Sequence, residues 1–564
     1  MIKNNPVVKS GIHGIPEAFT HESLHHFEGE SKIYRPATII LFALEKSLFG
    51  FDPGRFHIVN LILYGLVCMA FYRLLIVLFP KFDWRLLLIA SFLFLVHPVH
   101  TEVVANVKSQ DELLAALGCL WSLTYLIRYL DSGSSKFRFL AWSVLFYLLA
   151  VFSKESSVFF IAIFPMTLFL LRKRSIKIAA LKSMPYLVPV VIYMSARYLV
   201  LRNAEFYYER NILDNVLFGT NGLGELTATK ASILLMFITK LFFPAKLSWD
   251  YSYNQVPITT WTSLLPWLSI ALFLSLIAVA IYFLRKQPAV SWGISFFLLL
   301  ILPTSNILFI NLTTFAERFL FLPSAGAIVA FLPLMSLAAR GSLERAGRMR
   351  PSFYLPFMGL LLLCAVLTHK RTADWKDNIS LFESAASNAP NSSRVMAGLA
   401  SEYMSLAKWA STTEAHRRYL EKSKESFLRS LQIHPGNSEA AFQLGLAYAL
   451  TKDTSKAIHY YHQAIDHHYK QAFPFVNLSA IYVDKEQYDS ALYYLDKSFA
   501  LDSLDRMTLT NLTVVHYKRD EDHQVLKYVS IAERNGLNSE KITTMKSMSR
   551  KRLAENELPA GGIK

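Results

Sequence analysis

Two histidines and three carboxylates stand between two apolar runs near residue 100. His97, His100 and Glu102 follow the first run, and Asp111 and Glu112 open the second. Carboxylates in such a place can accept a proton from a hydroxyl group, and histidines can hydrogen-bond a polar ligand or hold a metal. A zinc site made of His97, His100 and Glu102 is the weaker interpretation, because their spacing matches no known zinc pattern.

The elements around these residues are apolar runs of the length that crosses a membrane. Of the 564 residues, 53% are apolar and 14% aromatic, which is too apolar for an ordinary soluble protein. The ten runs that we predict to span are 56–79, 84–98, 113–130, 137–153, 156–172, 181–201, 261–284, 289–308, 320–339 and 352–368. The run at 229–243 is short and contains Lys240, so we expect a surface or re-entrant helix there.

Loop charge predicts the orientation of these spans. The loops 79–85, 128–138, 172–182, 285–287 and 340–350 alternate along the chain and hold 16 Lys and Arg against 3 Asp and Glu. The positive-inside rule puts them in the cytoplasm, which leaves both termini outside. Because the basic residues interrupt apolar runs and share no soluble face, the net charge of +16 does not indicate a nucleic-acid partner.

The predicted outer loops carry further polar groups. The segments "YRP" (34–36), "SKES" (153–156), "SWDYSY" (248–253) and "FAERFLFLPS" (315–324) share that face with the stretch near residue 100. Charged groups at the rim of a membrane are costly unless they face a cavity or a partner. We therefore expect one shared outward-facing cleft, although each site alone is equally well explained by a helix cap or a snorkelling side chain.

A second pattern occupies the last third of the chain. Leu444, Leu478 and Leu512 recur every 34 residues, and Tyr448 and Tyr482 follow with the same spacing. A period of 34 is typical of tetratricopeptide repeats, in which helix pairs stack into a solenoid with a concave groove. We predict three clear repeats and an earlier copy that an insertion interrupts. The groove would present a protein substrate or serve only as an assembly scaffold.

Together these patterns predict an all-α protein, with a polytopic membrane helical bundle followed by a C-terminal tetratricopeptide α-solenoid. We expect an outer-face loop at 1–55, a multi-span domain at 56–370, a repeat domain at 371–550 and a disordered tail at 551–564. All three cysteines lie in apolar runs, so neither a disulfide framework nor a cysteine metal site is indicated.

The order of several motifs resembles that of a known family. The motifs are "YRP", "FGFDPGRFHIVNLILYG" (49–65), "HPVHTEVVANVKSQDELLAAL" (97–117), "SKES", "AERFLFLPSAG" (316–326) and "RTADWKDNISLFESA" (371–385), with the repeats after them. This order resembles the transmembrane and tetratricopeptide-repeat-containing O-mannosyltransferases and their bacterial relatives, which are multi-span glycosyltransferases of the GT-C class. The resemblance extends from about residue 4 over nearly the whole chain.

The resemblance implies transfer of a sugar, typically mannose, from a polyprenyl-phosphate carrier to Ser or Thr of a protein on the outer face. It implies no cofactor and no metal. Glu102, Asp111 and Glu112 are then the candidate catalytic residues, because they would orient the acceptor hydroxyl or the sugar. His97 and His100 are candidates to hydrogen-bond the sugar or to hold the loop.

The same chemistry requires cations for the carrier phosphate. Arg35, Lys154 and Arg318 are the candidates for this role. Glu155 and Glu317 stand beside them, either as ion-pair partners or as direct participants.

The family pattern places its principal catalytic carboxylate in the first outer loop, just after a first span. The part of that loop present here begins at Met1. We therefore expect the first span and the principal base to lie upstream of Met1. A fragment or a pseudoenzyme is the alternative.

Two other functions compete with the protein glycosyltransferase. One is a non-catalytic, membrane-anchored repeat scaffold, and the other is a carrier-lipid transferase that acts on a lipid or glycan. The expected partners are the bilayer, the carrier-linked sugar and acceptor proteins in the repeat groove. We expect a multi-pass protein of the bacterial inner membrane with its repeats in the periplasm, or of the endoplasmic reticulum membrane with its repeats in the lumen if it is eukaryotic.

Overall fold

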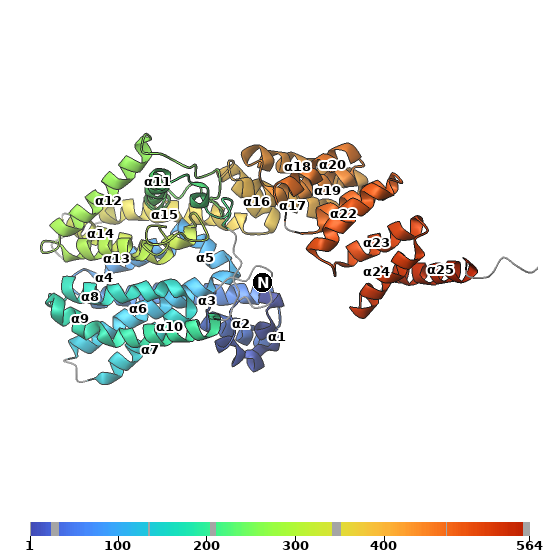
Figure 1. The fold of residues 1–564 in the computed structure, drawn as a ribbon. Coiled ribbons are helices and arrows are strands. Elements are labelled where there is room, and N and C mark those ends of the chain that lie inside the picture. The colour runs from blue at the N-terminus through green and yellow to red at the C-terminus, as the bar shows by residue number, and fades with distance from the viewer. Residues whose placement is uncertain are drawn as a thin grey trace, which may run out of the picture. The chain divides into compact units, whose positions relative to one another are not determined.

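The computed structural model describes residues 2–23, 33–132, 136–202, 210–340, 351–469, 471–537 and 539–556. Every regular element in these ranges is a helix, which confirms the predicted all-α class. The chain divides into two units, residues 1–392 and residues 393–564 (Figure 1).

Unit 1 contains sixteen α-helices and nine short 3₁₀-helices among its described residues. The α-helices are α1 (Pro6–Ser10), α2 (Pro36–Phe49), α3 (Pro53–Leu78), α4 (Trp84–Leu95), α5 (Thr101–Ala105), α6 (Gln110–Asp131), α7 (Phe137–Ser153), α8 (Ile163–Leu170), α9 (Ile176–Ser183), α10 (Leu187–Leu201), α11 (Leu223–Phe242), α12 (Leu264–Tyr282), α13 (Pro288–Ile301), α14 (Phe321–Arg340), α15 (Pro351–Asp374) and α16 (Asn378–Asn388). The 3₁₀-helices are η1 (Ile2–Asn4), η2 (Gly11–Gly14), η3 (Glu17–Phe19), η4 (Pro98–His100), η5 (Val107–Ser109), η6 (Glu155–Ala162), η7 (Met184–Tyr186), η8 (Val216–Gly219) and η9 (Glu317–Leu320).

Local sequence explains where several of these helices begin. Pro36 and Pro53 stand in the first turns of α2 and α3, where the missing backbone N–H is not needed. The side chains of Asp52 and Asp83 cap α3 and α4 by accepting hydrogen bonds from the first free N–H groups. Beyond Pro98 the apolar run of α4 continues as η4 and α5, but at an angle of 50° to α4.

Fewer helices can cross a membrane than the ten predicted. Those long and apolar enough among the described residues are Pro53–Leu78, Val107–Asp131, Ile176–Leu201, Leu264–Tyr282 and Glu317–Ala339, with Trp84–Leu95 and Pro98–Ala105 as a sixth if the bent pair is one span. Three more apolar helices are shorter, namely Phe137–Ser153, Glu155–Leu170 and Pro288–Ile301. Prolines and 3₁₀ breaks divide the expected runs. The described residues thus contain fewer full-length candidate spans than the ten runs predicted, and a multi-pass membrane protein is confirmed.

Two of the helices outside these candidate spans, α11 and α2, bear on the predictions. The run expected at 229–243 is the longer α11, which is not among the candidate spans. The predicted outer loop contains α2, which packs with α1 through a small apolar cluster that includes Val8, Phe42 and Phe56.

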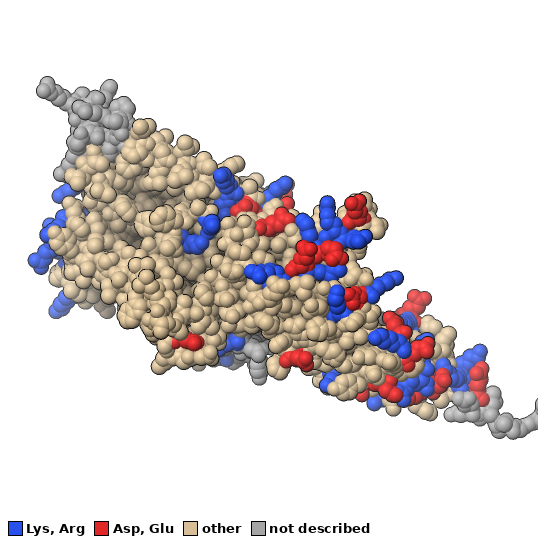
Figure 2. Space-filling model, turned by 90° about the horizontal axis from the view of Figure 1, so that it is seen from above, with Lys and Arg blue, Asp and Glu red and all other residues tan. Residues whose placement is uncertain are grey.

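Small residues allow the helices of unit 1 to pack closely. A Cβ on Gly293 of α13 would lie 2.5 Å from the backbone of α14, and one on Gly326 of α14 would lie 2.6 Å from the backbone of α13. Gly118 of α6 is as close to α7. Such contacts are typical of membrane helices, because small residues let two backbones approach. The face of unit 1 seen in Figure 2 is mostly uncharged, whereas charges cover unit 2.

Unit 2 is a stack of helix pairs that confirms the predicted tetratricopeptide solenoid. Its helices are α17 (Ser393–Lys408), α18 (Thr413–Ile433), α19 (Ser438–Leu450), α20 (Thr454–Asp466), α21 (Phe473–Asp484), α22 (Tyr488–Leu501), α23 (Arg506–Lys518), α24 (Asp522–Arg534) and α25 (Glu540–Asn556). Leu444, Leu478 and Leu512 are all fully buried, as the period of 34 requires.

Stacked rings join the two helices of successive repeats. Tyr448 lies on Tyr460 with ring centroids 5.5 Å apart, and Tyr482 lies on Tyr494 at the same distance. The next pair along the chain, His516 and Tyr528, stacks at 5.4 Å, and the earlier pair Tyr403 and Tyr419 stacks at 6.3 Å. The stacked pair therefore recurs in all four helix pairs, with a spacing of 34 residues from Tyr448 to Tyr482 and from Tyr482 to His516, and of 45 residues from Tyr403 to Tyr448.

Candidate active site

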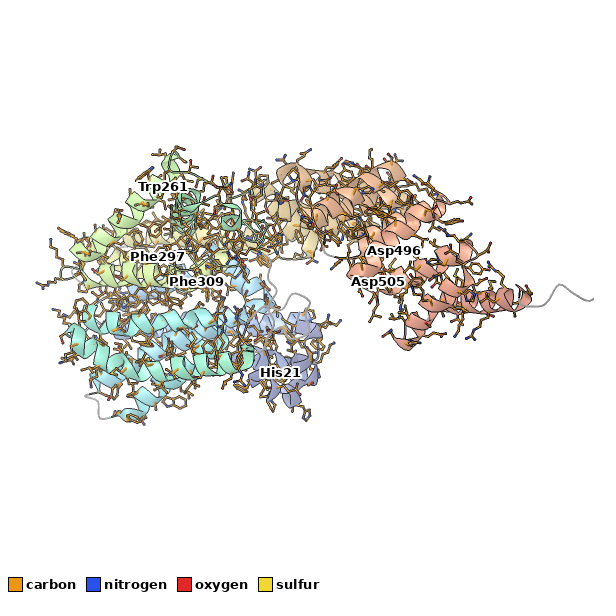
Figure 3. The ribbon with its side chains drawn as sticks, viewed as in Figure 1. His21, Trp261, Phe297, Phe309, Asp496 and Asp505 are labelled. Carbon is orange, nitrogen blue, oxygen red and sulfur yellow. The ribbon has the colours of Figure 1, made fainter. Side chains whose placement is uncertain are left out.

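A cavity of about 800 Å³ opens in unit 1 beside the start of α6. Its charged wall consists of Arg35, Lys108, Asp111, Lys154, Glu155, Arg197 and Arg318. Its apolar wall includes Val158, Phe159, Met194, Phe309 and Leu312. The rings of Phe159 and Phe309 lie 6.4 Å apart, and Figure 3 marks Phe309 in the loop between α13 and η9. The cavity thus combines five cations and two carboxylates with an apolar side.

Arg35 is fixed by two carboxylates from different elements. It stands directly before Pro36, which starts α2. Its Nε and Nη2 donate to the two carboxylate oxygens of Glu155 at 2.7 and 2.5 Å, and its Nη1 forms an ion pair with Asp111 of α6. Burial alone would lower the pKa of the guanidinium, but Glu155 and Asp111 outweigh burial and raise it. Arg35 therefore stays charged while it ties α2, η6 and α6 together.

Lys154 ends α7 and leads into η6, and its Nζ pairs with Glu112 in the first turn of α6. The two side chains are only 11% and 13% exposed. Glu112 lines a small adjoining cavity of about 50 Å³, which shares Lys154 and Arg318 with the large one. This pair therefore forms the boundary between the two cavities.

Arg318 in η9 is held by Glu102 of α5. One oxygen of Glu102 accepts the backbone N–H of Arg318 at 3.0 Å, and the other forms an ion pair with its guanidinium. Glu102 is 2% exposed and lines neither cavity, so it lies behind Arg318. Its position suits orienting the cation more than touching a substrate.

The two histidines lie away from the charged wall. His100 is buried, with Nδ1 2.9 Å from the Tyr64 hydroxyl and Nε2 2.9 Å from the Ser324 hydroxyl, so it joins α3 to α14. His97 lines a separate apolar cavity of about 430 Å³ between α4, α11, α14 and α15. Neither residue lines the charged cavity. Within the described part of the chain, no three or more His, Cys, Asp and Glu side chains are grouped to hold a metal ion.

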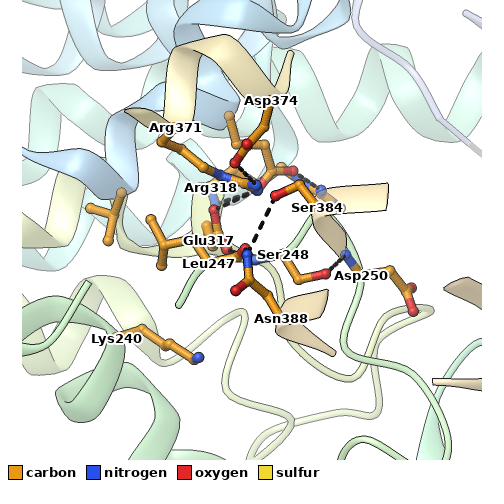
Figure 4. A network of polar contacts seen from close by, with 12 residues as sticks. Lys240, Leu247, Ser248, Asp250, Glu317, Arg318, Arg371, Asp374, Ser384 and Asn388 are labelled. Carbon is orange, nitrogen blue, oxygen red and sulfur yellow. Dashed lines mark hydrogen bonds and ion pairs between the residues drawn. The ribbon is translucent and has the colours of Figure 1, made fainter. Parts of the chain in front are cut away.

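A buried polar network stands directly behind η9 (Figure 4). Glu317, the neighbour of Arg318, is fully buried and accepts hydrogen bonds from the Tyr251 hydroxyl at 2.7 Å and the Ser248 N–H at 2.5 Å. Its other oxygen lies 3.4 Å from Nη2 of Arg371, near the end of α15. The network therefore fixes the backbone from which Arg318 reaches the cavity.

This network joins three motifs that are far apart in the sequence, namely "SWDYSY", "AERFLFLPSAG" and "RTADWKDNISLFESA". The adjoining chain is fastened to the same loop. Asn388 of α16 donates to the Leu247 carbonyl at 2.9 Å, and Ser392 donates to Asp250 at 3.0 Å. The segment 378–392 thus belongs to unit 1.

Three functional candidates were not singled out from the sequence. Lys108 and Arg197 line the cavity, and Arg371 holds Glu317. Lys108 and Arg371 both lie inside motifs quoted above. Considering every charged residue of those motifs would therefore have found them. Arg197 lies in the apolar helix α10, where a lone arginine indicates a polar cavity or partner.

The fold and the cavity define a class: a multi-pass membrane protein with a tetratricopeptide solenoid, similar over most of its length to protein O-mannosyl-transferases. The predicted resemblance is thereby confirmed. No family model matches the chain.

Three relatives illustrate the similarity. The chain is 28% identical to protein O-mannosyl-transferase F38B6.6 of Caenorhabditis elegans over 402 residues, which are 70% of this chain and 54% of that protein. It is 26% identical to protein O-mannosyl-transferase TMTC4 of Mus musculus over 64% of this chain and 54% of that one. It is 24% identical to TMTC3 of Mus musculus over 75% and 46%. The chain spans about half the length of these relatives.

Proposed function

We propose that the protein is a glycosyltransferase of the GT-C class that moves mannose from a polyprenyl-phosphate carrier to Ser or Thr of proteins. The observation that carries this proposal is the cavity, in which five cations stand beside an apolar wall. A polyprenyl-phosphate sugar has the matching chemistry, because its phosphate requires cations and its isoprenoid chain requires an apolar surface. The relatives named protein O-mannosyl-transferases support the same activity.

In the proposed reaction the acceptor hydroxyl oxygen forms a bond to C1 of the sugar, and the bond between C1 and the phosphate oxygen breaks. The leaving group takes the electron pair and becomes a phosphate monoester, whose added negative charge the cavity cations stabilise. The hydroxyl proton must pass to a base. Because Glu102, Asp111 and Glu112 are each held by a cation, one of them could take the proton only after its ion pair has opened.

The partners and the location follow from the same proposal. Acceptor proteins would dock in the groove of the solenoid, and the cavity would face the periplasm or the lumen. The basic loops between the spans support this orientation.

A second candidate is a pseudoenzyme that binds the carrier lipid without turnover. The complete pairing of the three nominated catalytic carboxylates favours it, because a carboxylate engaged by a cation is a weaker base.

Synthetic mannosyl-phosphoryl-polyprenol and a Ser/Thr-containing polypeptide would be supplied to the full chain in lipid nanodiscs. Transfer of mannose, detected by mass spectrometry, is the expected result, with glucosyl-phosphoryl-polyprenol as the control donor. Donor binding without transfer would support the pseudoenzyme instead. Absence of donor binding would overturn both candidates.

A further inference from the structure

The cations nominated from the sequence are already neutralised by the protein. Arg35 is bound to Asp111 and Glu155, and the remaining two pairs are Lys154 with Glu112 and Arg318 with Glu102. An incoming phosphate can use these cations only by competing with carboxylates that hold them closely. The first contact with an anion is therefore expected from a cation that has no such partner.

Among the described residues of the cavity wall, Lys108 is a cation in that position. It stands in η5, directly before α6, its side chain is exposed, and it lines the cavity. The described residues offer it no ion pair. The same cavity wall holds the cations Arg35, Arg318 and Lys154 and the carboxylate Asp111, which is bound to Arg35.

Lys108 differs from these three cations, because each of them is paired with a carboxylate. A phosphate beside Lys108 would supply the anionic partner that the described residues do not offer this lysine. The apolar wall, which includes Phe159 and Phe309, borders the same cavity and would take the attached hydrocarbon chain.

We propose that Lys108 is the primary ligand for the phosphate of the carrier lipid, a role that rests on the proposed function. The ligand class is a long-chain isoprenoid phosphate, as a monoester or as a diester to a sugar. Arg35, Lys154 and Arg318 shape the cavity wall. Their attraction to the phosphate increases as negative charge develops on this leaving group.

Binding of polyprenyl monophosphate to the full chain in detergent tests the proposal without requiring turnover. Lys108→Gln should weaken binding about tenfold or more, because a charged hydrogen bond is lost, and should reduce its salt dependence. Lys108→Arg should retain most of the affinity. The matched control is Lys182→Gln, at an exposed lysine of α9 outside the cavity, and it should bind like the unchanged protein.

Two further probes identify the ligand. Inorganic phosphate should bind weakly and lose affinity in Lys108→Gln, whereas polyprenol without phosphate should bind all variants alike. Equal binding of polyprenyl phosphate to Lys108→Gln and the unchanged protein would overturn the proposal, as would failure of the unchanged protein to bind it. Loss of affinity in Lys108→Arg as large as in Lys108→Gln would also overturn it. Binding without sugar transfer would refute the proposed function alone.

Discussion

Each of the cations Arg35, Lys154 and Arg318 at the cavity wall forms an ion pair with a carboxylate. Each partner comes from another element, so every pair also fixes the position of two segments. Removing one member of a partly buried pair leaves the other desolvated, which costs more than the pair itself contributes. The pairs therefore specify the shape of the cavity more than they stabilise the fold.

Glu102→Gln tests this positioning role. The amide keeps the shape and can still accept the Arg318 N–H, but the charge that holds the guanidinium is lost. We expect sugar transfer to fall at least about tenfold, while the unpaired Arg318 lowers the melting temperature without unfolding the protein at the assay temperature. Initial rates and melting curves of the variant measure the two effects.

The control is Glu225→Gln, in the first turn of α11 and outside the cavity. It should transfer sugar like the unchanged protein. Full activity of Glu102→Gln, or loss of activity through unfolding alone, would show that Glu102 has no role in catalysis.

The sequence allowed part of this site to be anticipated. Arg35, Asp111, Lys154 and Arg318 line one cavity, because a charged residue at the end of an apolar run must find a polar surface. The position of His100 could not be foreseen, because its partners Tyr64 and Ser324 lie far away in the chain. The choice of partner for each cation likewise depends on tertiary packing.

At the scale of elements, the positions of the apolar runs were predicted correctly. The points at which the helices within these runs are interrupted were not predicted. The run 156–172 divides into η6 and α8, and the run 289–308 ends as α13 at Ile301, before Pro303. A hydropathy pattern records where apolar residues are, whereas 3₁₀ breaks and proline stops depend on local backbone contacts. The solenoid was easier to predict, because its contacts repeat between neighbours.

The contact between α2 and α6 carries a pH-dependent group. Glu45 of α2 is 2% exposed and accepts a hydrogen bond from the Gln110 amide at 2.8 Å. Its second oxygen and the Gln110 carbonyl oxygen have no partner among the described residues. Burial raises the pKa of Glu45 to about 7, although the bond from Gln110 opposes the shift.

The sign of the effect follows from where the proton is held. Between the ordinary pKa of 4.5 and about 7, the folded protein holds the Glu45 proton more tightly than the unfolded chain does. The contribution of this proton to the free energy of unfolding is therefore complete below pH 4.5, and it is lost as the pH rises to 7.

Glu45→Gln should remove this dependence. Above pH 7 the variant should be more stable than the unchanged protein, by at most about 3 kcal/mol at about 1.4 kcal/mol per pKa unit. Below pH 4.5 the two proteins should melt alike. Melting temperatures of both proteins in detergent at several pH values measure the difference, and parallel curves across the whole range would contradict the assignment.

At the scale of the whole molecule, the two units divide the proposed work. Unit 1 contains the cavity, and every residue that lines it precedes residue 320. Unit 2 has its own core around the buried leucines and stacked rings. A protein ending after Ser392 keeps the hydrogen bond from Ser392 to Asp250 and loses only the repeats.

Residues 1–392 alone should bind polyprenyl phosphate with an affinity within about threefold of the full chain, since the ligand contacts proposed lie in unit 1. Glycosylation of a folded acceptor protein should fall about tenfold or more, because the proposed docking groove is absent. Binding titration and mass spectrometry of the acceptor report the two effects. Unchanged glycosylation would refute docking by the repeats.

The Glu317–Arg371 pair also constrains how the protein is made. Glu317 leaves the ribosome 54 residues before the arginine that neutralises it, so every growing chain passes through a stage with a carboxylate destined for burial and no cation to meet it. A buried charge without its partner costs several kcal/mol. The buried network around η9 is therefore complete only after Arg371 of α15 has been made. A chain that stopped before Arg371 would leave the Glu317 carboxylate without this cation.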